Sequence, residues 1–388
     1  MTLLLLPVGL LLPTLCGRFA IKILERGHPV LQPLERWTLS VVFGITITMY
    51  ISFLCEILGF INFTLVGLLG VQVFTALALG LFWMRCSVRW ISPPPPPTLP
   101  HSPKISKRTR IILILLCVWT AAKILGGFVT LVATPPYEDD VFNNWNMRGK
   151  LFYHTQELSL EYEAGNENLS TGGVHSYPAT VPLTKTWLAT LRGQWHEGLV
   201  NSIHIVWFLA ALSLVYCTLR RKMTKAWALG GAYALSSLPL YFVHSTTAYA
   251  DVFLSVHVFA ALSLLLGALE SDDAEHRATF LRLGALASGL LVFTKNEALL
   301  MHLPVLALMV LLSLRFLSRS DALDSKAVRS AFLHYVMLIG IVLVPWVLFK
   351  LTHNLNFGNA KSVLNLTFSW QEGVAYAIGV NTFLEGNW

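Results

Sequence analysis

Charged residues are scarce in this sequence, and their scarcity excludes an ordinary soluble domain. Only 13% of the 388 residues are Asp, Glu, Lys or Arg, whereas soluble domains carry about 25%. Hydrophobic residues make up 55% of the chain. Apolar runs of about 20 residues recur along it, long enough to cross a hydrocarbon core about 30 Å thick. Because backbone polar groups in lipid must be satisfied within each segment, we expect every run to be a helix.

Several chemistry-bearing patterns are also missing. There is no CxxC pair, which argues against a disulfide framework or a zinc site. A Walker loop, a GxSxG motif and an HExxH motif are absent. No apolar run carries the repeated charges of a voltage sensor or proton pump. The five cysteines all lie in or beside apolar runs: Cys16, Cys55, Cys86, Cys117 and Cys217.

The apolar runs predict an all-α polytopic membrane protein with about ten transmembrane helices. No Lys or Arg precedes Arg18, so the first run is expected to be a retained helix rather than a signal peptide. The predicted spans are 2–17, 38–60, 63–84, 111–133, 199–219, 226–243, 251–269, 279–294, 298–318 and 333–351.

The basic residues predict the orientation of these spans. With the N-terminus outside, the inside loops contain 20 of the 28 Lys and Arg residues, as the positive-inside rule requires. The net charge of +7 therefore indicates orientation rather than nucleic-acid binding. The predicted regions are three N-terminal helices (1–84), a Pro-rich basic cytoplasmic linker (85–110), a seven-helix module (111–351) with a large outside loop (134–198), and an outside C-terminal segment (352–388).

The most polar stretch, "PPYEDDVFNNWNMRGK" (135–150), follows the fourth predicted span. It places Glu138, Asp139 and Asp140 side by side, and adjacent carboxylates favour binding a cation or sharing a proton. A solvated turn or a helix N-cap is the alternative, since Asp is favoured at helix starts. Trp145 and its aromatic neighbours predict an amphipathic helix at the membrane interface, which would hold a carboxylate at the level of the lipid headgroups.

Further polar residues interrupt the outside ends of later spans. Asp251 begins one span, and Lys295 and Glu297 separate two others. Ionisable residues at such positions are candidates for function, and polar backbone at membrane depth is tolerated where it lines a cavity. The alternatives are an N-cap for Asp251 and a self-satisfied Lys295–Glu297 pair. Weaker candidates are His175 and Tyr177 in the outside loop, Tyr249 beside Asp251, and His353 after the last span.

At these residues the chain resembles the GT-C superfamily of integral-membrane glycosyltransferases. It is similar to prokaryotic members related to protein O-mannosyltransferases and to the aminoarabinose transferases of lipid A. The segments "YEDDVFNNWNMRGK" (137–150), "AYADVFL" (248–254) and "FTKNEALL" (293–300) carry the resemblance. In that family a seven-helix module carries a large first outside loop, and the catalytic acid stands at the start of this loop. The resemblance covers about residues 110–388.

The resemblance implies an inverting transfer from a polyprenyl- or dolichyl-phosphate sugar to a glycan, lipid or protein acceptor. Asp140 would be the general base with Asp139 as its partner, although their order is open. Lys295 or Arg148 would contact the donor phosphate. The acids are adjacent rather than a DxD pair, which weakens the usual argument for a metal-chelating pair. The sequence therefore leaves open whether Asp139 and Asp140 hold a divalent metal ion (Mg²⁺ or Mn²⁺).

Two compartments fit this topology: the bacterial inner membrane with a periplasmic site, or the endoplasmic reticulum with a lumenal site. Two other function classes also remain. A transporter or flippase for a lipid-linked or anionic solute would show inverted repeats and midplane polar groups, and a scaffold protein would need no site at all.

Overall fold

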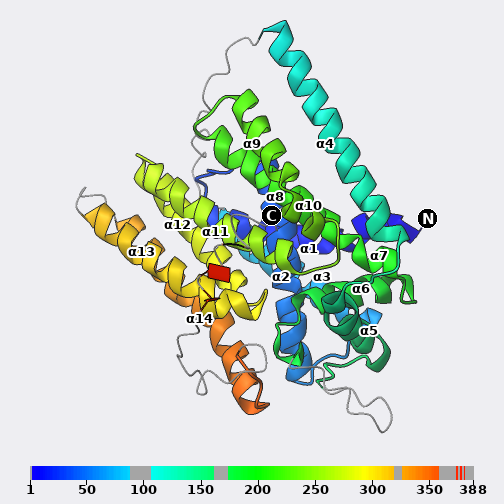
Figure 1. Ribbon diagram of the computed structural model, residues 1–388. Coiled ribbons are helices and arrows are strands. Elements are labelled where there is room, and N and C mark those ends of the chain that lie inside the picture. The colour runs from blue at the N-terminus through cyan, green and yellow to red at the C-terminus, as the bar shows by residue number, and fades with distance from the viewer. Residues whose placement is uncertain are drawn as a thin grey trace.

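The computed structural model describes residues 2–87, 106–160, 174–318, 326–357 and five residues between 373 and 380. Within these ranges all regular secondary structure is helical (Figure 1). Most of the predicted linker, residues 161–173 of the predicted outside loop and most of the predicted C-terminal segment lie outside the described residues.

Eight helical segments of the described chain are long and apolar enough to cross a membrane. A ninth arises if α9 (Lys225–Ser237) and α10 (Pro239–Ser245), which are bent by 78° to each other, count as one span. The eight are η1 with α1 (Thr2–Leu4, Leu5–Glu25), α2 (Pro33–Ile57), α3 (Leu65–Ser87), α4 (Lys107–Ala133), α7 with α8 (Glu197–Asn201, Ile203–Arg220), α11 (Asp251–Glu270), η4 with α13 (Ala298–His302, Leu303–Ser318) and α14 (Lys326–Thr352). The prediction of a polytopic helical membrane protein is confirmed at this level.

The eight or nine candidates fall short of the ten predicted spans, because the run at 279–294 does not pass this test of length and composition. It forms α12 (Ala274–Leu291), which carries Glu275, Arg277 and Arg282 and so does not qualify as a span by composition. Every residue from 278 to 291 is buried. Its neighbours α11 and α14 pack along it, so α12 is the centre of the fold.

The three N-terminal helices join this same core. α1 and α2 cross closely at Gly17 and Gly44, where an added Cβ would lie 2.0 Å from the Ser40 carbonyl oxygen and 1.8 Å from the Pro13 carbonyl oxygen. α2 then packs against α8 and α12. In contrast, only 6% of the most apolar stretch of α4 is buried, and α4 lies at the periphery in Figure 1.

Polar contacts gather at two opposite ends of the bundle. At one end Trp187 Nε1 donates to the Gly9 carbonyl oxygen (2.8 Å). At the other, Arg36 pairs with Glu25 (2.6 Å). Gly9 and Glu25 lie on α1 about 24 Å apart at 1.5 Å per helical residue. The first end collects the loops predicted to lie outside, and the second collects those predicted to lie inside.

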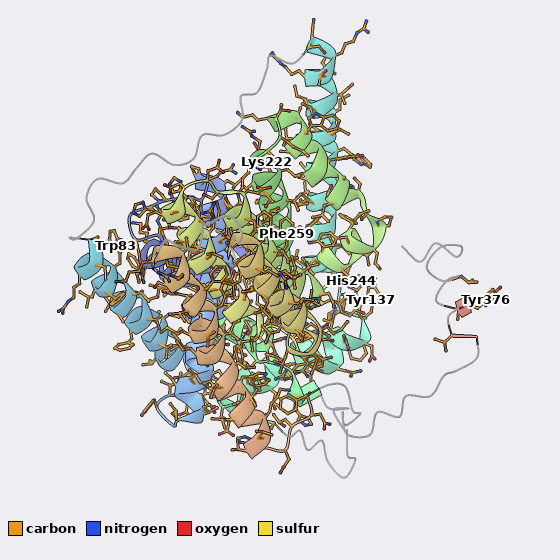
Figure 2. The ribbon with its side chains drawn as sticks, turned by 90° about the vertical axis from the view of Figure 1, so that its left-hand side faces the viewer. Trp83, Tyr137, Lys222, His244, Phe259 and Tyr376 are labelled. Carbon is orange, nitrogen blue, oxygen red and sulfur yellow. The ribbon has the colours of Figure 1, made fainter. Side chains whose placement is uncertain are left out.

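Short helices cover the first end. They are the π-helical turn η2 (Val141–Trp145), α5 (Asn146–Thr155), the short η3 (Val174–Ser176), α6 (Thr180–Arg192) and α7. In Figure 2, Tyr137 and His244 of this end lie on the opposite side of Phe259 from Lys222. A helix exists where the interfacial helix was predicted, as η2 and α5, and it packs on α6. The prediction that its aromatic residues lie at the membrane interface was wrong for Trp145 and Phe152, because both are fully buried within the protein.

Candidate functional site

The three adjacent acids have different surroundings. Asp139 is exposed, and its carboxylate accepts a hydrogen bond from the Asn143 side chain. The carbonyl of Glu138 accepts a hydrogen bond from the Val141 amide (3.0 Å). Asp140 stands at the N-cap position of η2, yet its side chain makes no capping hydrogen bond. The N-cap alternative is therefore not what holds the Asp140 carboxylate in place.

Lys295 is the centre of a cluster that joins four parts of the chain. Its Nζ lies 2.9 Å from Asp251 Oδ1 and 3.6 Å from Glu297 Oε1. It also lies 5.9 Å from the ring centres of both Trp145 and Tyr177. The Tyr177 hydroxyl donates to Glu297 Oε1 (3.2 Å), which closes the cluster. Lys295 itself is only 7% exposed, so this cation is shielded from water.

Asp140 belongs to the same electrostatic neighbourhood. Burial raises the pKa of Asp140, Lys295 opposes the rise, and Asp251, Asp139 and Glu297 add to it. For Lys295, burial alone would lower the pKa, but Asp251, Glu297 and Asp140 outweigh burial and the pKa is raised. Lys295 thus stays positively charged at neutral pH. Three carboxylates act on this one lysine, which leaves the cluster with an excess of negative charge.

Tyr249 and His244 stand at the edge of the cluster. Burial raises the pKa of Tyr249, and the charges of Asp140, Glu138 and Asp251 raise it further. The rings of Tyr249 and His244 are 5.1 Å apart, and His244 Nδ1 lies 3.8 Å from Asp251 Oδ2. His244 was not among the residues that the sequence pattern selected, and it belongs to the last turn of α10, just before the turn that leads into α11.

Both charged segments run directly into π-helical turns. Asp140 precedes η2, and Glu297 precedes η4. A single π turn widens a helix and re-aims the side chains near it, and such turns occur often at functional sites. Here the two turns bring the acidic segment after α4 and the Lys295 turn after α12 to one location.

Two buried cations, Arg148 and Lys350, bind backbone carbonyls at and next to Tyr177. Arg148, predicted at the donor phosphate, is 4% exposed and donates from Nη2 to the Tyr177 carbonyl (2.9 Å). Burial lowers the pKa of Arg148 to about 9. Lys350 donates from Nζ to the Ser176 carbonyl (2.6 Å) and to Asn296 Oδ1 (2.9 Å). These two cations fix consecutive carbonyls and so position the Tyr177 ring beside Lys295.

The remaining predicted residues lie around this arrangement. His175 is half-buried in η3, next to the clamped carbonyls. His353 lies at the end of α14, where its ring centre is 4.2 Å from that of Phe349 and its Nδ1 is 3.0 Å from the Phe349 carbonyl oxygen. Its contacts are thus with its own helix, whereas the other predicted residues gather around Lys295 and Tyr177.

A buried lysine network behind the cluster was missed in the sequence. Lys185 of α6 donates to the side-chain oxygens of Asn146 and Asn201 (3.1 Å for Asn201). Asn146 in turn donates to Glu197 Oε2 (2.5 Å). Burial lowers the pKa of Lys185 to about 7, and Glu197 opposes this. The network ties α5, α6 and α7 together. Its only signal in the sequence was the unusual number of Asn residues in "FNNWN".

An apolar cavity of about 430 Å³ opens beside the cluster. It lies between α8, the bent pair α9–α10 and α11, and its lining includes Leu254, Phe259 and Leu262. Asp251 and His302 also line it. Asp251, which holds Lys295, therefore also borders a largely apolar cavity between helices that are candidate membrane spans.

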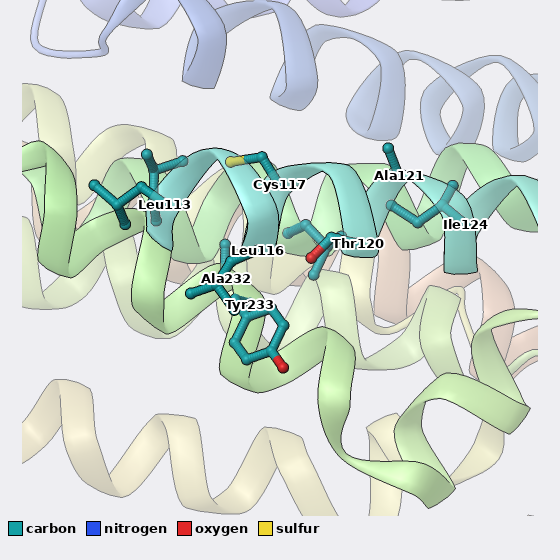
Figure 3. A pocket seen from close by; sticks show the side chains of 10 residues that line it. Leu113, Leu116, Cys117, Thr120, Ala121, Ile124, Ala232 and Tyr233 are labelled. Atoms are coloured by element: carbon teal, nitrogen blue, oxygen red, sulfur yellow. The ribbon is translucent and has the colours of Figure 1, made fainter. Parts of the chain in front are cut away.

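Two other cavities border α4. One of about 160 Å³ is lined by polar groups that include Glu138, Asn201 and Thr247, and by the exposed Tyr137. The other, of about 200 Å³, is apolar and lies between α4 and α9, where Cys117 and Tyr233 line it (Figure 3). The polar cavity adjoins the acidic segment.

Among the described residues, no group of three or more His, Cys, Asp or Glu side chains is arranged to hold a metal ion. Asp139 and Asp140 therefore do not form a chelating set with a third such side chain in the described parts of the chain.

No family model, no curated protein and no solved structure matches this chain.

Proposed function

We propose that the protein is a membrane glycosyltransferase of the GT-C type. It would transfer a sugar from a polyprenyl- or dolichyl-phosphate donor to an acceptor hydroxyl, with inversion. The observation that carries this proposal is the position of Asp251, which both holds Lys295 at 2.9 Å and lines the 430 Å³ apolar cavity. Such a cavity suits a lipid chain, and the charged cluster at its border suits the phosphate and the reacting sugar.

In this mechanism the acceptor hydroxyl oxygen attacks the anomeric carbon, and the bond from that carbon to the phosphate oxygen breaks. Asp140 takes the proton of the hydroxyl as general base. Its raised pKa brings it nearer to the working pH, which favours proton transfer. Lys295 stabilises the negative charge that grows on the leaving lipid phosphate, and a shielded cation is effective for this purpose.

The other residues would serve this reaction from a distance. Arg148 and Lys350 act as positioning residues through the Ser176 and Tyr177 carbonyls, rather than as phosphate ligands. The polar cavity beside Glu138 and Tyr137 offers hydroxyl-binding groups and an aromatic face for a sugar ring. A glycan, lipid or protein acceptor is compatible with this arrangement.

The excess of carboxylates around Lys295 opposes the binding of a phosphate. A divalent cation such as Mg²⁺ or Mn²⁺, arriving with the donor, would supply the missing positive charge. Because the described residues contain no three-ligand set, we assign no metal ligands and derive no step through a metal.

The donor-binding step can be tested with a polyprenyl-phosphate sugar and the purified protein. Lys295→Ala removes a charge-assisted contact worth about 1.5–3 kcal/mol and should weaken binding roughly 10- to 150-fold. Leu254→Trp fills the apolar cavity and should also weaken binding. Leu266→Trp, on the exposed face of the same helix, is the matched control. Equal affinity for all four proteins would contradict the proposed donor site.

A transporter or flippase is the second candidate, because one structural feature favours it. The span formed by α9 and α10 is broken by 78°, and broken helices are typical of transporters. Donor binding without any sugar transfer, together with uptake or flipping of the lipid-linked solute in vesicles, would support this candidate over the transferase.

A further inference from the structure

Two cations of α1 lie over tryptophan rings at the end of the bundle opposite the candidate site. The Arg18 guanidinium carbon is 4.5 Å from the ring centre of Trp37 on α2. Lys22 Nζ is 4.1 Å from the ring centre of Trp83 on α3. Arg18 and Lys22 are four residues apart and so share one face of α1. Three helices therefore build a single basic and aromatic surface.

Neither cation has a carboxylate as a direct partner. In the part of the chain that the structure describes, Arg18 and Lys22 form no ion pair. The acids nearest in sequence make their direct pairs elsewhere, since Glu25 pairs with Arg36 (2.6 Å) and Glu35 pairs with Arg221, and Glu25 reaches Arg18 and Lys22 only through the longer-range field of its charge. Arg18 and Lys22 thus keep donor capacity and positive charge for an anion from outside the chain.

The surroundings of these cations belong to a membrane interface. Trp37 is 53% exposed, and tryptophan is enriched where hydrocarbon meets the headgroups. Leu34 and Met84, from the neighbouring helix ends, are 47% and 50% exposed. Long basic side chains near helix ends keep their charge at this level while their stems remain in the apolar layer. An anion held here would therefore lie at headgroup depth with hydrocarbon beside it.

We propose that Arg18 and Lys22, supported by Trp37 and Trp83, bind the phosphate of an anionic phospholipid headgroup. The guanidinium offers a planar pair of donors and the ammonium a point charge, which together suit a phosphate oxygen cluster. This end of the bundle is the predicted cytoplasmic end, and anionic lipids attract basic residues at that surface. A lipid phosphate is preferred to a free phosphate ion, because the exposed apolar side chains beside the cations can contact acyl chains.

The test compares lipid retention by the full chain, purified in detergent and exposed to defined phospholipids, using native mass spectrometry. Wild type should retain phosphatidylglycerol in preference to phosphatidylcholine. Each cation near an anionic surface contributes about fivefold in affinity, so Arg18→Gln with Lys22→Gln should reduce that preference by roughly 25-fold. The exchange variant Arg18→Lys with Lys22→Arg keeps both charges and should retain it.

The matched control is Arg108→Gln with Arg110→Gln, which removes two exposed cations from α4 at the same predicted end. It should leave the phosphatidylglycerol preference unchanged. An equal loss in this control, or no loss in the Arg18 and Lys22 variant, would overturn the proposal. Displacement of the lipid by millimolar inorganic phosphate would show a free-anion site and would overturn it as well.

Discussion

At the scale of single residues, two adjacent acids can have different partners. Asp139 and Asp140 are both exposed, but Asp139 accepts a hydrogen bond from Asn143, whereas Asp140 makes no capping hydrogen bond and lies in the field of Lys295, with its pKa raised by burial. A general base needs a position next to the reacting atoms and a pKa near the working pH. The raised pKa of Asp140 and its place in the field of Lys295 favour Asp140 over Asp139 as the proposed base, and the order of the two acids stays a prediction.

Lys185 should make stability depend on pH. Its pKa is about 7 in the folded protein and 10.5 ordinarily, so between these values the unfolded chain binds the extra proton. Stability therefore rises as the pH rises from about 7 toward 10, by at most about 1.4 kcal/mol per pH unit from this group. Lys185→Met should lose this rise and also leave two buried amide oxygens without their donor.

Thermal unfolding of the purified protein at pH 7 and pH 9 measures this effect. The difference in stability between wild type and Lys185→Met should grow with pH. Lys150→Met, which removes an exposed lysine from the same helical layer, should show no such growth. A constant difference across this range would mean that Lys185 is charged in the folded protein.

The sequence pattern selected residues where polarity is unusual and missed those where polarity is internally satisfied. Asp251 and Lys295 interrupt apolar runs, so their positions were predictable, and the structure brings them to 2.9 Å. Lys185 and Lys350 bind neutral oxygens contributed by distant segments. Such partners depend on the tertiary arrangement, and no spacing along the chain indicates them.

At the scale of helices, the closest crossing joins α1 to α2 through small residues. Gly44→Ala should destabilise the protein by about 1–3 kcal/mol, because the new methyl group would overlap the Pro13 carbonyl and push the helices apart. Gly70→Ala in α3 is the matched control, since nothing lies within 4 Å of an added Cβ there. In thermal unfolding, Gly44→Ala should be less stable than wild type and Gly70→Ala should not. Equal stability of the two variants would contradict the close crossing.

The predicted helices exist, and their ends differ for identifiable reasons. The first span was predicted to end at residue 17, but α1 continues to Glu25, because Arg18 and Lys22 lie over tryptophan rings and their charges do not end the helix. The run at 226–243 is bent after Ser237, because Pro239 begins α10 and disfavours a helical conformation at Leu238. Lys123 donates to the Ser236 carbonyl beside this break (2.8 Å). Hydrophobicity alone carries no information about the contacts of Arg18, Lys22 and Lys123.

At the scale of the whole molecule, polar contacts at the two ends follow the predicted alternation of the loops. This predicts opposite accessibility for the α2–α3 turn and the α11–α12 turn. In a background without native cysteines, Asn62→Cys should react with a membrane-impermeant thiol reagent from one side, and Asp272→Cys from the other. Both positions are exposed. Labelling of both from the same side would contradict the topology on which the proposed site depends.

The central claim is that Asp140 is the base of a sugar transfer, and a transfer assay with a polyprenyl-phosphate sugar tests it most directly. Asn keeps the size of Asp but cannot take a proton, so Asp140→Asn should lower turnover by about 10² to 10⁴ while donor binding persists. Asp139→Asn should lose far less, because the Asp139 carboxylate is already bound by Asn143. Near wild-type turnover in Asp140→Asn and Asp139→Asn alike would contradict the proposed chemistry.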